Sequence, residues 1–218
     1  MRIRKIAILF AGFMSISVFG QKLDEAKSLL DEVTQKVESY KNISIEFNSK
    51  IDNSEADVHQ ETNGKVTIQG DLYRLNYMGV EQIFNGEKVF LIIHEDEEVI
   101  IQKPSNDSDD ALTPSKMLTF YKSGYSYQMD ALKTVNGKKI QYVKLIPIDS
   151  NSEVTSILIG IDVKSKHIHS IATTGENSTV TTLEVKTFRY NQPISEKLFV
   201  FDKAKYKDQK NYIISEPN

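Results

Sequence analysis

The chain has 218 residues, of which 39% are hydrophobic, and its formal net charge is −3 at pH 7. This length is enough to bury a sizeable core within one domain. The acidic balance disfavours nucleic acid as a partner, because binding to phosphates relies on an excess of Lys and Arg. The chain has no cysteine, which excludes disulfides, thiol nucleophiles and the attachment of lipid to cysteine.

The first twenty residues have the pattern of a signal peptide. Apolar residues 6–19 follow a basic start and end at the small residue Gly20; the basic residues are Arg2, Arg4 and Lys5. An apolar run this short is typical of a cleaved export signal. We expect cleavage after Gly20, which would leave residues 21–218 as one soluble periplasmic domain. An uncleaved membrane anchor is the alternative. Cleavage would remove three basic residues, so the net charge would move from −3 to −6.

An amphipathic helix is predicted over residues 23–40. Apolar residues recur there at three- and four-residue spacing, and they are Leu23, Ala26, Leu29, Leu30, Val33, Val37 and Tyr40. Acidic residues near the start of this helix, such as Asp24 and Glu25, suit the positive end of the helix dipole. We expect the apolar stripe to pack on a sheet. A helix on a membrane surface is the alternative, and its acidic polar face makes it less favourable.

The hydrophobic period then changes to two, which predicts β-strands. Residues 43–51 alternate in this way, and a second strand is expected at residues 60–69. Residues 64–102 divide into five short strands at tight turns such as Asn85-Gly86, and strands joined so closely pair antiparallel. Residues 89–93 are apolar at every position. We therefore expect this strand to be covered on both sides, by a lumen and by a helix.

A polar loop and a short helix are expected in the middle of the chain. Residues 103–110 are rich in polar and acidic side chains but lack the spacing of a calcium-binding loop. Thr113 can cap a helix and Pro114 suits its first position, so a helix is predicted over residues 112–121, before Gly124. This helix could be a lid over a binding cavity or an ordinary cover of the core.

Further strands are predicted at residues 125–131, 139–147, 155–163, 167–173 and 179–190. With the earlier ones they make roughly eleven strands, joined by turn-rich connections. Pro193 and the apolar residues 198–201 are expected to hold the tail against the domain. The predicted fold is mainly β: an incomplete, unclosed antiparallel barrel with an N-terminal amphipathic helix and a short helical lid on its inner face.

The sequence contains no convincing catalytic or cofactor motif. His167 and His169 lie two apart on a predicted strand and could begin a zinc site, but no third ligand lies near them in the sequence. The Gly-x-Ser-x-Gly nucleophile motif and a glycine-rich phosphate loop are both missing from the sequence. We therefore predict a protein that is not an enzyme and that uses no cofactor or metal.

The order of several segments resembles a known family. The chain reads VESYKNISIEFNSK at the end of the predicted helix, followed by GKVTIQGDLYRLNY, IFNGEKVFLIIHEDEEVIIQ, LTPSKMLTFYKSGY and FRYNQPISEKLFVFD. These segments span nearly all of the chain after residue 20. Their order resembles the periplasmic outer-membrane lipoprotein carrier family, LolA, in its Bacteroidetes-like form. The resemblance implies an incomplete barrel of about eleven antiparallel strands closed by helices.

The resemblance also implies partners. Members of that family carry the acyl chains of lipoproteins from an inner-membrane lipoprotein-releasing ABC transporter complex to the outer membrane. The expected partners are therefore acylated lipoproteins, that complex and an outer-membrane acceptor, with no nucleic acid, and the protein is expected to be a monomer. In better-known members an arginine near the start of the third strand ties the lid to the barrel. Here Gln69-Gly70-Asp71 occupies that region and Arg74 lies further on, so we expect lid control to differ.

The candidate ligand site is an apolar cavity on the concave face of the sheet, because a lipid carrier must bury its ligand. Alternate strand positions and the lid are expected to line it: Ile45, Phe47, Leu75, Tyr77, Phe90, Ile92, Met117, Phe120, Tyr121, Ile159, Ile161 and Leu183. The same residues could instead fill a solid core. Two other functions stay open: a periplasmic module that senses or binds lipids or lipoproteins, and a non-catalytic structural β-protein.

Overall fold

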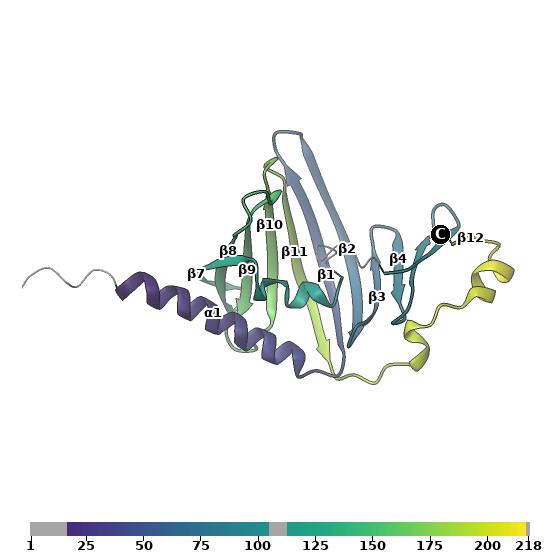
Figure 1. The fold of residues 1–218 in the computed structure, drawn as a ribbon, viewed down its shortest axis with the longest axis horizontal. Helices are drawn as coiled ribbons and strands as arrows, with labels where there is room; N and C mark the ends of the chain where they lie inside the picture. The colour runs from purple at the N-terminus through teal and green to yellow at the C-terminus, as the bar shows by residue number, and fades with distance from the viewer. Residues whose placement is uncertain (1–16, 105–112, 217–218) are drawn as a thin grey trace, which may run out of the picture.

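The computed structural model describes residues 17–104 and 113–216. A long helix, α1 (Ser17–Glu38), precedes a twelve-stranded sheet (Figure 1). The strands are β1 (Ile43–Asn53), β2 (Val58–Gln69), β3 (Leu72–Tyr77), β4 (Val80–Phe84), β5 (Val89–Ile93), β6 (Glu98–Gln102), β7 (Tyr125–Val135), β8 (Lys138–Pro147), β9 (Val154–Asp162), β10 (Ile168–Gly175), β11 (Val180–Tyr190) and β12 (Ile213–Ser215). Four short turns of helix complete the described elements: η1 (Lys116–Leu118), η2 (Phe120–Lys122), η3 (Glu196–Phe199) and η4 (Lys205–Gln209).

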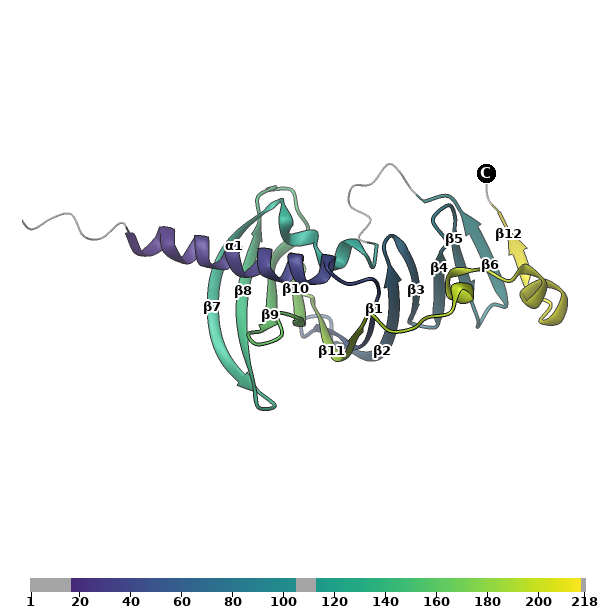
Figure 2. The same ribbon diagram turned by 90° about the horizontal axis from the view of Figure 1, so that it is seen from below.

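Strand β1 lies at the centre of the sheet and joins its two halves. It pairs antiparallel with β2 on one side and with β11 on the other. A meander runs from β2 to β6 in one half and another runs between β11 and β7 in the other, while β12 pairs parallel with β6. Within the described chain the edge strands β7 and β12 do not pair with each other, and the sheet is strongly curved (Figure 2). The predicted mainly β fold, an unclosed barrel with an N-terminal helix, is confirmed.

Cross-strand registers fix which side chains face the concave side of the sheet. Ile45 on β1 lies opposite Val66 on β2 and Phe188 on β11. Val66 in turn lies opposite Leu75 on β3. Because directly paired residues point to the same face, these side chains form one apolar surface across the centre of the sheet.

Helix α1 covers the concave side of the half of the sheet that contains β7–β10 (Figure 2). Ala26, Leu30 and Val33 recur at helical spacing and are buried. They belong to one core cluster with Ile159 and Ile161 of β9. The apolar stripe predicted from the sequence therefore packs on the sheet.

The predicted signal peptide falls largely outside the described residues, which begin at Ser17. Helix α1 also begins at Ser17, so cleavage after Gly20 would shorten it. Cleavage itself stays a prediction. No helix within residues 17–104 and 113–216 is long and apolar enough to cross a membrane.

The C-terminal segment covers the outer face of β3–β6. Phe201 stacks on Phe90 with ring centroids 4.6 Å apart, and Tyr206 is buried in the same cluster. Arg74 on β3 pairs with the buried Glu81 on β4, and its guanidinium donates to a backbone carbonyl of η3 at 3.1 Å. The tail is therefore held to the sheet, as expected, through aromatic stacking and through an ion pair beneath it.

Strand β5 departs from the sequence-based expectation. Leu75 lies opposite Gln82, and Gln82 lies opposite Leu91, so Leu91 shares the concave face with Leu75. Phe90 and Ile92 consequently point outward, because neighbouring residues of a strand face opposite sides. No long helix covers the outer face of β5 in the described structure. The C-terminal segment covers it instead, with single helical turns and extended chain.

The predicted helix over residues 112–121 is replaced by two short turns, η1 and η2. Thr119 separates them with φ at −141°, which is not helical. Thr113 does begin the segment as expected, since its carbonyl oxygen accepts from the Met117 amide at 2.9 Å. Residue 112 lies outside the described residues. We refer to residues 113–122 as the cover segment.

Truncation of Phe90 should destabilise the protein strongly, because the side chain is buried between the sheet and the tail. We expect Phe90→Ala to lower the free energy of unfolding by about 3–5 kcal/mol. Leu132→Ala on β7 is the matched control, because Leu132 is exposed and its loss should change stability by less than about 0.5 kcal/mol. Urea unfolding followed by circular dichroism measures both. Equal, small losses would show that the tail does not bury Phe90.

Candidate functional site

An apolar cavity of about 300 Å³ lies between the concave face of the sheet and the cover segment. We refer to it as the main cavity. Strands β1, β2, β3, β10 and β11 form its floor, and the end of α1 and the cover segment close it. Its lining residues are Val37, Ile45, Phe47, Val66, Ile68, Leu75, Tyr77, Pro114, Met117, Leu118, Ile168, Ile171, Thr181, Leu183, Val185 and Phe188.

The lining is almost entirely hydrocarbon. Among these residues only Tyr77 and Thr181 carry a polar side-chain atom, and the Tyr77 hydroxyl is 2.8 Å from the hydroxyl oxygen of Ser49. Strand alternation explains most of this chemistry, since the lining residues of β1 and β2, and those from Thr181 to Val185 on β11, lie two apart and share one face. Such a surface offers no group for acid–base or nucleophilic chemistry. It suits an apolar ligand.

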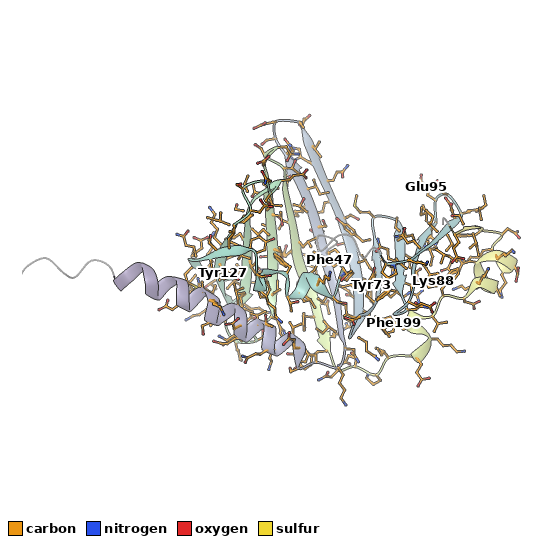
Figure 3. All side chains as sticks on the ribbon, in the orientation of Figure 1. Phe47, Tyr73, Lys88, Glu95, Tyr127 and Phe199 are labelled. Carbon is orange, nitrogen blue, oxygen red and sulfur yellow. The ribbon has the colours of Figure 1, made fainter. Side chains whose placement is uncertain are left out.

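Phe47 lines the cavity floor and lies beside the cover segment (Figure 3). Its ring rests on Gly64 of β2: a Cβ added at Gly64 would come within 2.2 Å of the ring atom Cζ. The ring also packs against Tyr77 with centroids 5.6 Å apart. Glycine at this position therefore allows an aromatic ring to lie flat on the sheet and leaves space above it.

The cover segment is held firmly at one end and lightly at the other. Tyr121 is only 1% exposed. Its hydroxyl accepts from Thr34 of α1 at 3.2 Å, and its carbonyl oxygen accepts from the Tyr127 hydroxyl at 2.7 Å. At the other end, within the described residues, the Ser115 hydroxyl donates one exposed hydrogen bond of 3.3 Å to the Gly70 carbonyl oxygen. The apolar residues of η1 therefore close the cavity from the weakly held end.

An aromatic cluster closes the end of the cavity nearest the C-terminus of α1. His167 stacks on Phe188 with ring centroids 4.1 Å apart, and Tyr40 stacks on Tyr190 at 4.2 Å. The Tyr40 hydroxyl is 2.8 Å from Nε2 of His167. Burial lowers the pKa of His167, and the nearby Lys36 lowers it further. His167 is therefore engaged in packing and in this hydrogen bond.

Two further hollows continue along the concave side. One of about 390 Å³ lies beyond Phe47 towards the β1–β2 hairpin and is lined by Ser49, Ile51, Gln60, Glu61, Thr62 and Met78. The other, of about 810 Å³, lies over β3–β6 and includes Tyr73, Leu91 and Lys103. The cover segment separates this second hollow from the main cavity, because Pro114 and Met117 line one while Ser115 and Lys116 line the other.

The structure brings six of the predicted site residues together around the main cavity: Ile45, Phe47, Leu75, Tyr77, Met117 and Leu183. Four others belong to the adjoining core: Ile159, Ile161 and Tyr121 are buried in the cluster that contains α1, and Phe120 packs against that cluster. The ligand-binding role of all these residues stays a prediction.

Phe90 and Ile92 do not lie at the cavity. They belong to the separate core cluster beneath the C-terminal segment. The reason is the register of β5, which turns Leu91 and not Phe90 to the concave side. Because both faces of this strand are apolar, alternation alone could not distinguish them.

The sequence analysis missed the rest of the lining. Val66 on β2, and Val185 and Phe188 on β11, lie opposite the predicted cavity residues of β1, whereas Ile68 on β2 lies opposite Ile43. On β2 the two-residue spacing of Val66 and Ile68 could have identified them as cavity residues. On β11 the register shifts between Glu46 and Phe47 of β1, so Val185 and Phe188 are three apart and break the period of two.

Within the described residues, no group of three or more His, Asp or Glu side chains could hold a metal ion. The described residues therefore provide no third ligand for the zinc site that His167 and His169 could begin. Arg74, which we did not equate with the lid arginine of the family, pairs with Glu81 on the outer face, away from the cover segment.

A family model described as "Outer membrane lipoprotein carrier protein LolA" matches residues 38–202, which is most of the chain. The chain belongs to the LolA family. The matched region begins at the end of α1 and includes β1–β11 and η3, so it contains every lining residue of the main cavity except Val37. It ends before η4 and β12. No match was found among curated proteins.

Solved structures share the LolA-like fold at low sequence identity. An uncharacterised conserved protein from Thermus thermophilus is 9% identical, with a TM-score of 0.57 over 88% of this chain and 99% of that chain. LprF from Mycobacterium bovis is also 9% identical, with a TM-score of 0.50 over 79% of this chain and 95% of that chain. At such identity the likeness concerns the fold alone.

Acidification should weaken the protein through His167. Because the pKa of His167 is lowered in the folded state, the unfolded chain binds this proton more readily near the ordinary histidine pKa of about 6.5. The free energy of unfolding should therefore fall as the pH falls through that region. We expect urea unfolding at pH 7.5 and pH 5.5 to show a larger loss for the wild type than for His167→Gln. Equal losses would contradict this assignment.

Proposed function

We propose that this protein is a periplasmic carrier that binds the acyl chains of lipoproteins in the main cavity and moves them from the inner to the outer membrane. The observation that carries the proposal is the hydrocarbon lining of this cavity beneath a weakly held cover. Membership of the LolA family, described as an outer membrane lipoprotein carrier family, supports it. A lipid- or lipoprotein-sensing module would use the same cavity without the transfer step.

The size of the cavity implies that the ligand must open it. A water molecule occupies about 30 Å³ in the liquid and a methylene group is of similar size, so about 300 Å³ holds roughly ten methylene groups. Two or three long acyl chains need several times this space. The cover segment therefore has to move when a lipoprotein binds, or most of each chain would stay outside.

The attachment of the cover segment sets the direction of this movement. Tyr121 is buried and bonded to α1 and β7, so it acts as the fixed end. Residues 113–118 carry Pro114, Met117 and Leu118 over the cavity. They can swing away when the bond between Ser115 and Gly70 breaks and the buried Leu118 leaves the core. Methionine adapts well to irregular apolar ligands. The cover segment thus acts as the lid.

Release also follows from the energetics of burial. Each methylene group removed from water contributes about 0.8 kcal/mol, so complete burial of several chains would exceed any reversible affinity. Displacement of Met117 and Leu118 from the cavity exposes their apolar surface and offsets part of this gain. A carrier built in this way binds lipid and can still give it up.

The partners we propose are acylated lipoproteins, an inner-membrane lipoprotein-releasing ABC transporter complex and an outer-membrane acceptor. The sequence has no glycine-rich phosphate loop of its own, so we attribute the direction of transfer to partners of different affinity. A signal peptide over residues 1–20 would place the protein in the periplasm, where it would act as a soluble monomer. No nucleic acid, cofactor or catalytic step enters this proposal.

Gly64→Ala tests the use of the main cavity. An added Cβ cannot share space with the Phe47 ring, so the ring must turn up into the cavity. The ring would then displace about two methylene groups of a bound acyl chain, each worth about 0.8 kcal/mol. The binding of a fluorescent diacylated lipopeptide should therefore weaken roughly tenfold. Fluorescence titration measures the dissociation constant.

Gly160→Ala is the matched control. A Cβ added at Gly160 also meets a close neighbour, the Ser170 hydroxyl at 2.7 Å, but Gly160 lies on the opposite face of the sheet from Ile159 and Ile161. We expect this variant to bind the lipopeptide as the wild type does. Equal affinities of Gly64→Ala and the wild type would show that the ligand does not occupy the space above Phe47.

A further inference from the structure

The concave face changes its chemistry along the strands. Towards α1 the central strands present Ile, Val, Leu and Phe, whereas towards the β1–β2 hairpin hydroxyl groups appear among the apolar side chains. Ser49 on β1 lies opposite Thr62 on β2, and Thr181 on β11 lies opposite Thr173 on β10. With Tyr77 on β3, these side chains form what we call the hydroxyl belt: Ser49, Thr62, Tyr77, Thr173 and Thr181.

The hydroxyl belt marks the boundary between the main cavity and the hollow of about 390 Å³ beyond it. Tyr77 and Thr181 line the main cavity. Ser49 and Thr62 line the neighbouring hollow, and the bond between the Ser49 and Tyr77 hydroxyls joins the two groups. An acyl chain in the main cavity that points towards the hairpin would therefore carry its polar end to this belt.

The Ser49–Tyr77 pair retains a hydrogen-bond donor for a ligand. Two hydroxyls contain two hydrogens, and their mutual bond of 2.8 Å uses one. Ser49 is only 1% exposed, whereas the Tyr77 side chain lines the cavity. When Ser49 donates to the Tyr77 oxygen, the Tyr77 hydrogen stays available to an acceptor in the cavity that this side chain lines. An acceptor on the ligand would satisfy it, and an unmatched donor in such a site is unfavourable.

The charges around the belt favour a neutral acceptor. Among the side chains described for the adjoining hollow, Glu61 alone is charged, and it faces Lys50 at 3.7 Å. A phosphate group would therefore find no unengaged cation in this hollow. Hydroxyl donors without a neighbouring cation suit the carbonyl oxygens of esters.

We infer that the hydroxyl belt is a subsite for the ester carbonyls that join the acyl chains to glycerol. The inference rests on the proposed function, because it requires acyl chains in the main cavity. Tyr77 and Thr181 would donate to an ester carbonyl while the chain extends over Phe47 towards α1. Such esters occur in lipoproteins and in phospholipids, so the subsite recognises a linkage that both share.

The test compares ester ligands with ether ligands. The first pair is a diacylated lipopeptide and its dialkyl ether analogue, which have equal chain lengths but differ in the carbonyl groups. The second pair is a diacyl phosphatidylglycerol and its ether analogue. Dissociation constants are measured for the wild type, for Tyr77→Phe and for Thr181→Val, two changes that remove a hydroxyl and keep the shape. Circular dichroism melting establishes that each variant is folded.

We expect the wild type to bind the esters more tightly than the ethers. In at least one variant the ratio of ester to ether affinity should fall about threefold to tenfold, because only ester binding weakens. Tyr73→Phe is the matched control: it removes a hydroxyl from the same strand as Tyr77, and Tyr73 lines the hollow over β3–β6 and not the main cavity. The preference should persist in this variant. A change in the lipopeptide pair only would identify lipoprotein as the source, and a change in both pairs would identify the shared ester.

The outcomes separate the two proposals. If the wild type binds none of the four lipids, the proposed function itself fails. If the wild type binds them but neither variant changes the ratio of ester to ether affinity, the carrier function stands and the ester subsite is wrong. Equal loss of ester and ether binding in both variants would also overturn the subsite, since it would reflect packing and not the carbonyl.

Discussion

The fold depends on one mismatch: the concave face of the sheet presents more apolar surface than the helical elements fill. The pairing of β1 with β2 and β11 brings Ile45, Phe47 and their neighbours into one continuous surface. Helix α1 fills the half of the sheet around β9, and the cover segment reaches the other half through Pro114 and η1. The main cavity is the unfilled remainder. Its apolar lining is stable without close packing because the rest of the domain is well packed.

Two separate clusters provide that packing. One lies beneath α1 and includes Val33, Ile159 and Tyr121, and the other lies beneath the C-terminal segment and includes Phe90 and Tyr206. The second cluster is on the outer face of β3–β6, so it stabilises the sheet without occupying the concave side. This separation allows the cavity to change its contents while the strands that form its floor stay in place.

Much of this architecture could be predicted from the sequence, because alternation is a reliable signal where one face of a strand is polar. It assigned the cavity face of β1 correctly through Ile45 and Phe47. It failed at β5, where Phe90 and Leu91 are both apolar and only the register with β4 decides between them. Ile159 faces the concave side as predicted, but α1 and not the cavity lies above it. The strand pattern cannot show which of the two covers a strand, because this depends on the tertiary packing. The cover segment was located correctly, yet Thr119 divides it into two turns.

Hydrogen–deuterium exchange of the full chain with and without a diacylated lipopeptide tests the central claim, that acyl chains enter the main cavity by displacing the cover. The account predicts that the amides of Met117 and Thr119, which are bonded within the cover segment, exchange faster when the lipid is bound. The amides of β1 and β11 beneath them should stay protected. Unchanged exchange over residues 113–119 in the lipid-bound protein would contradict this account.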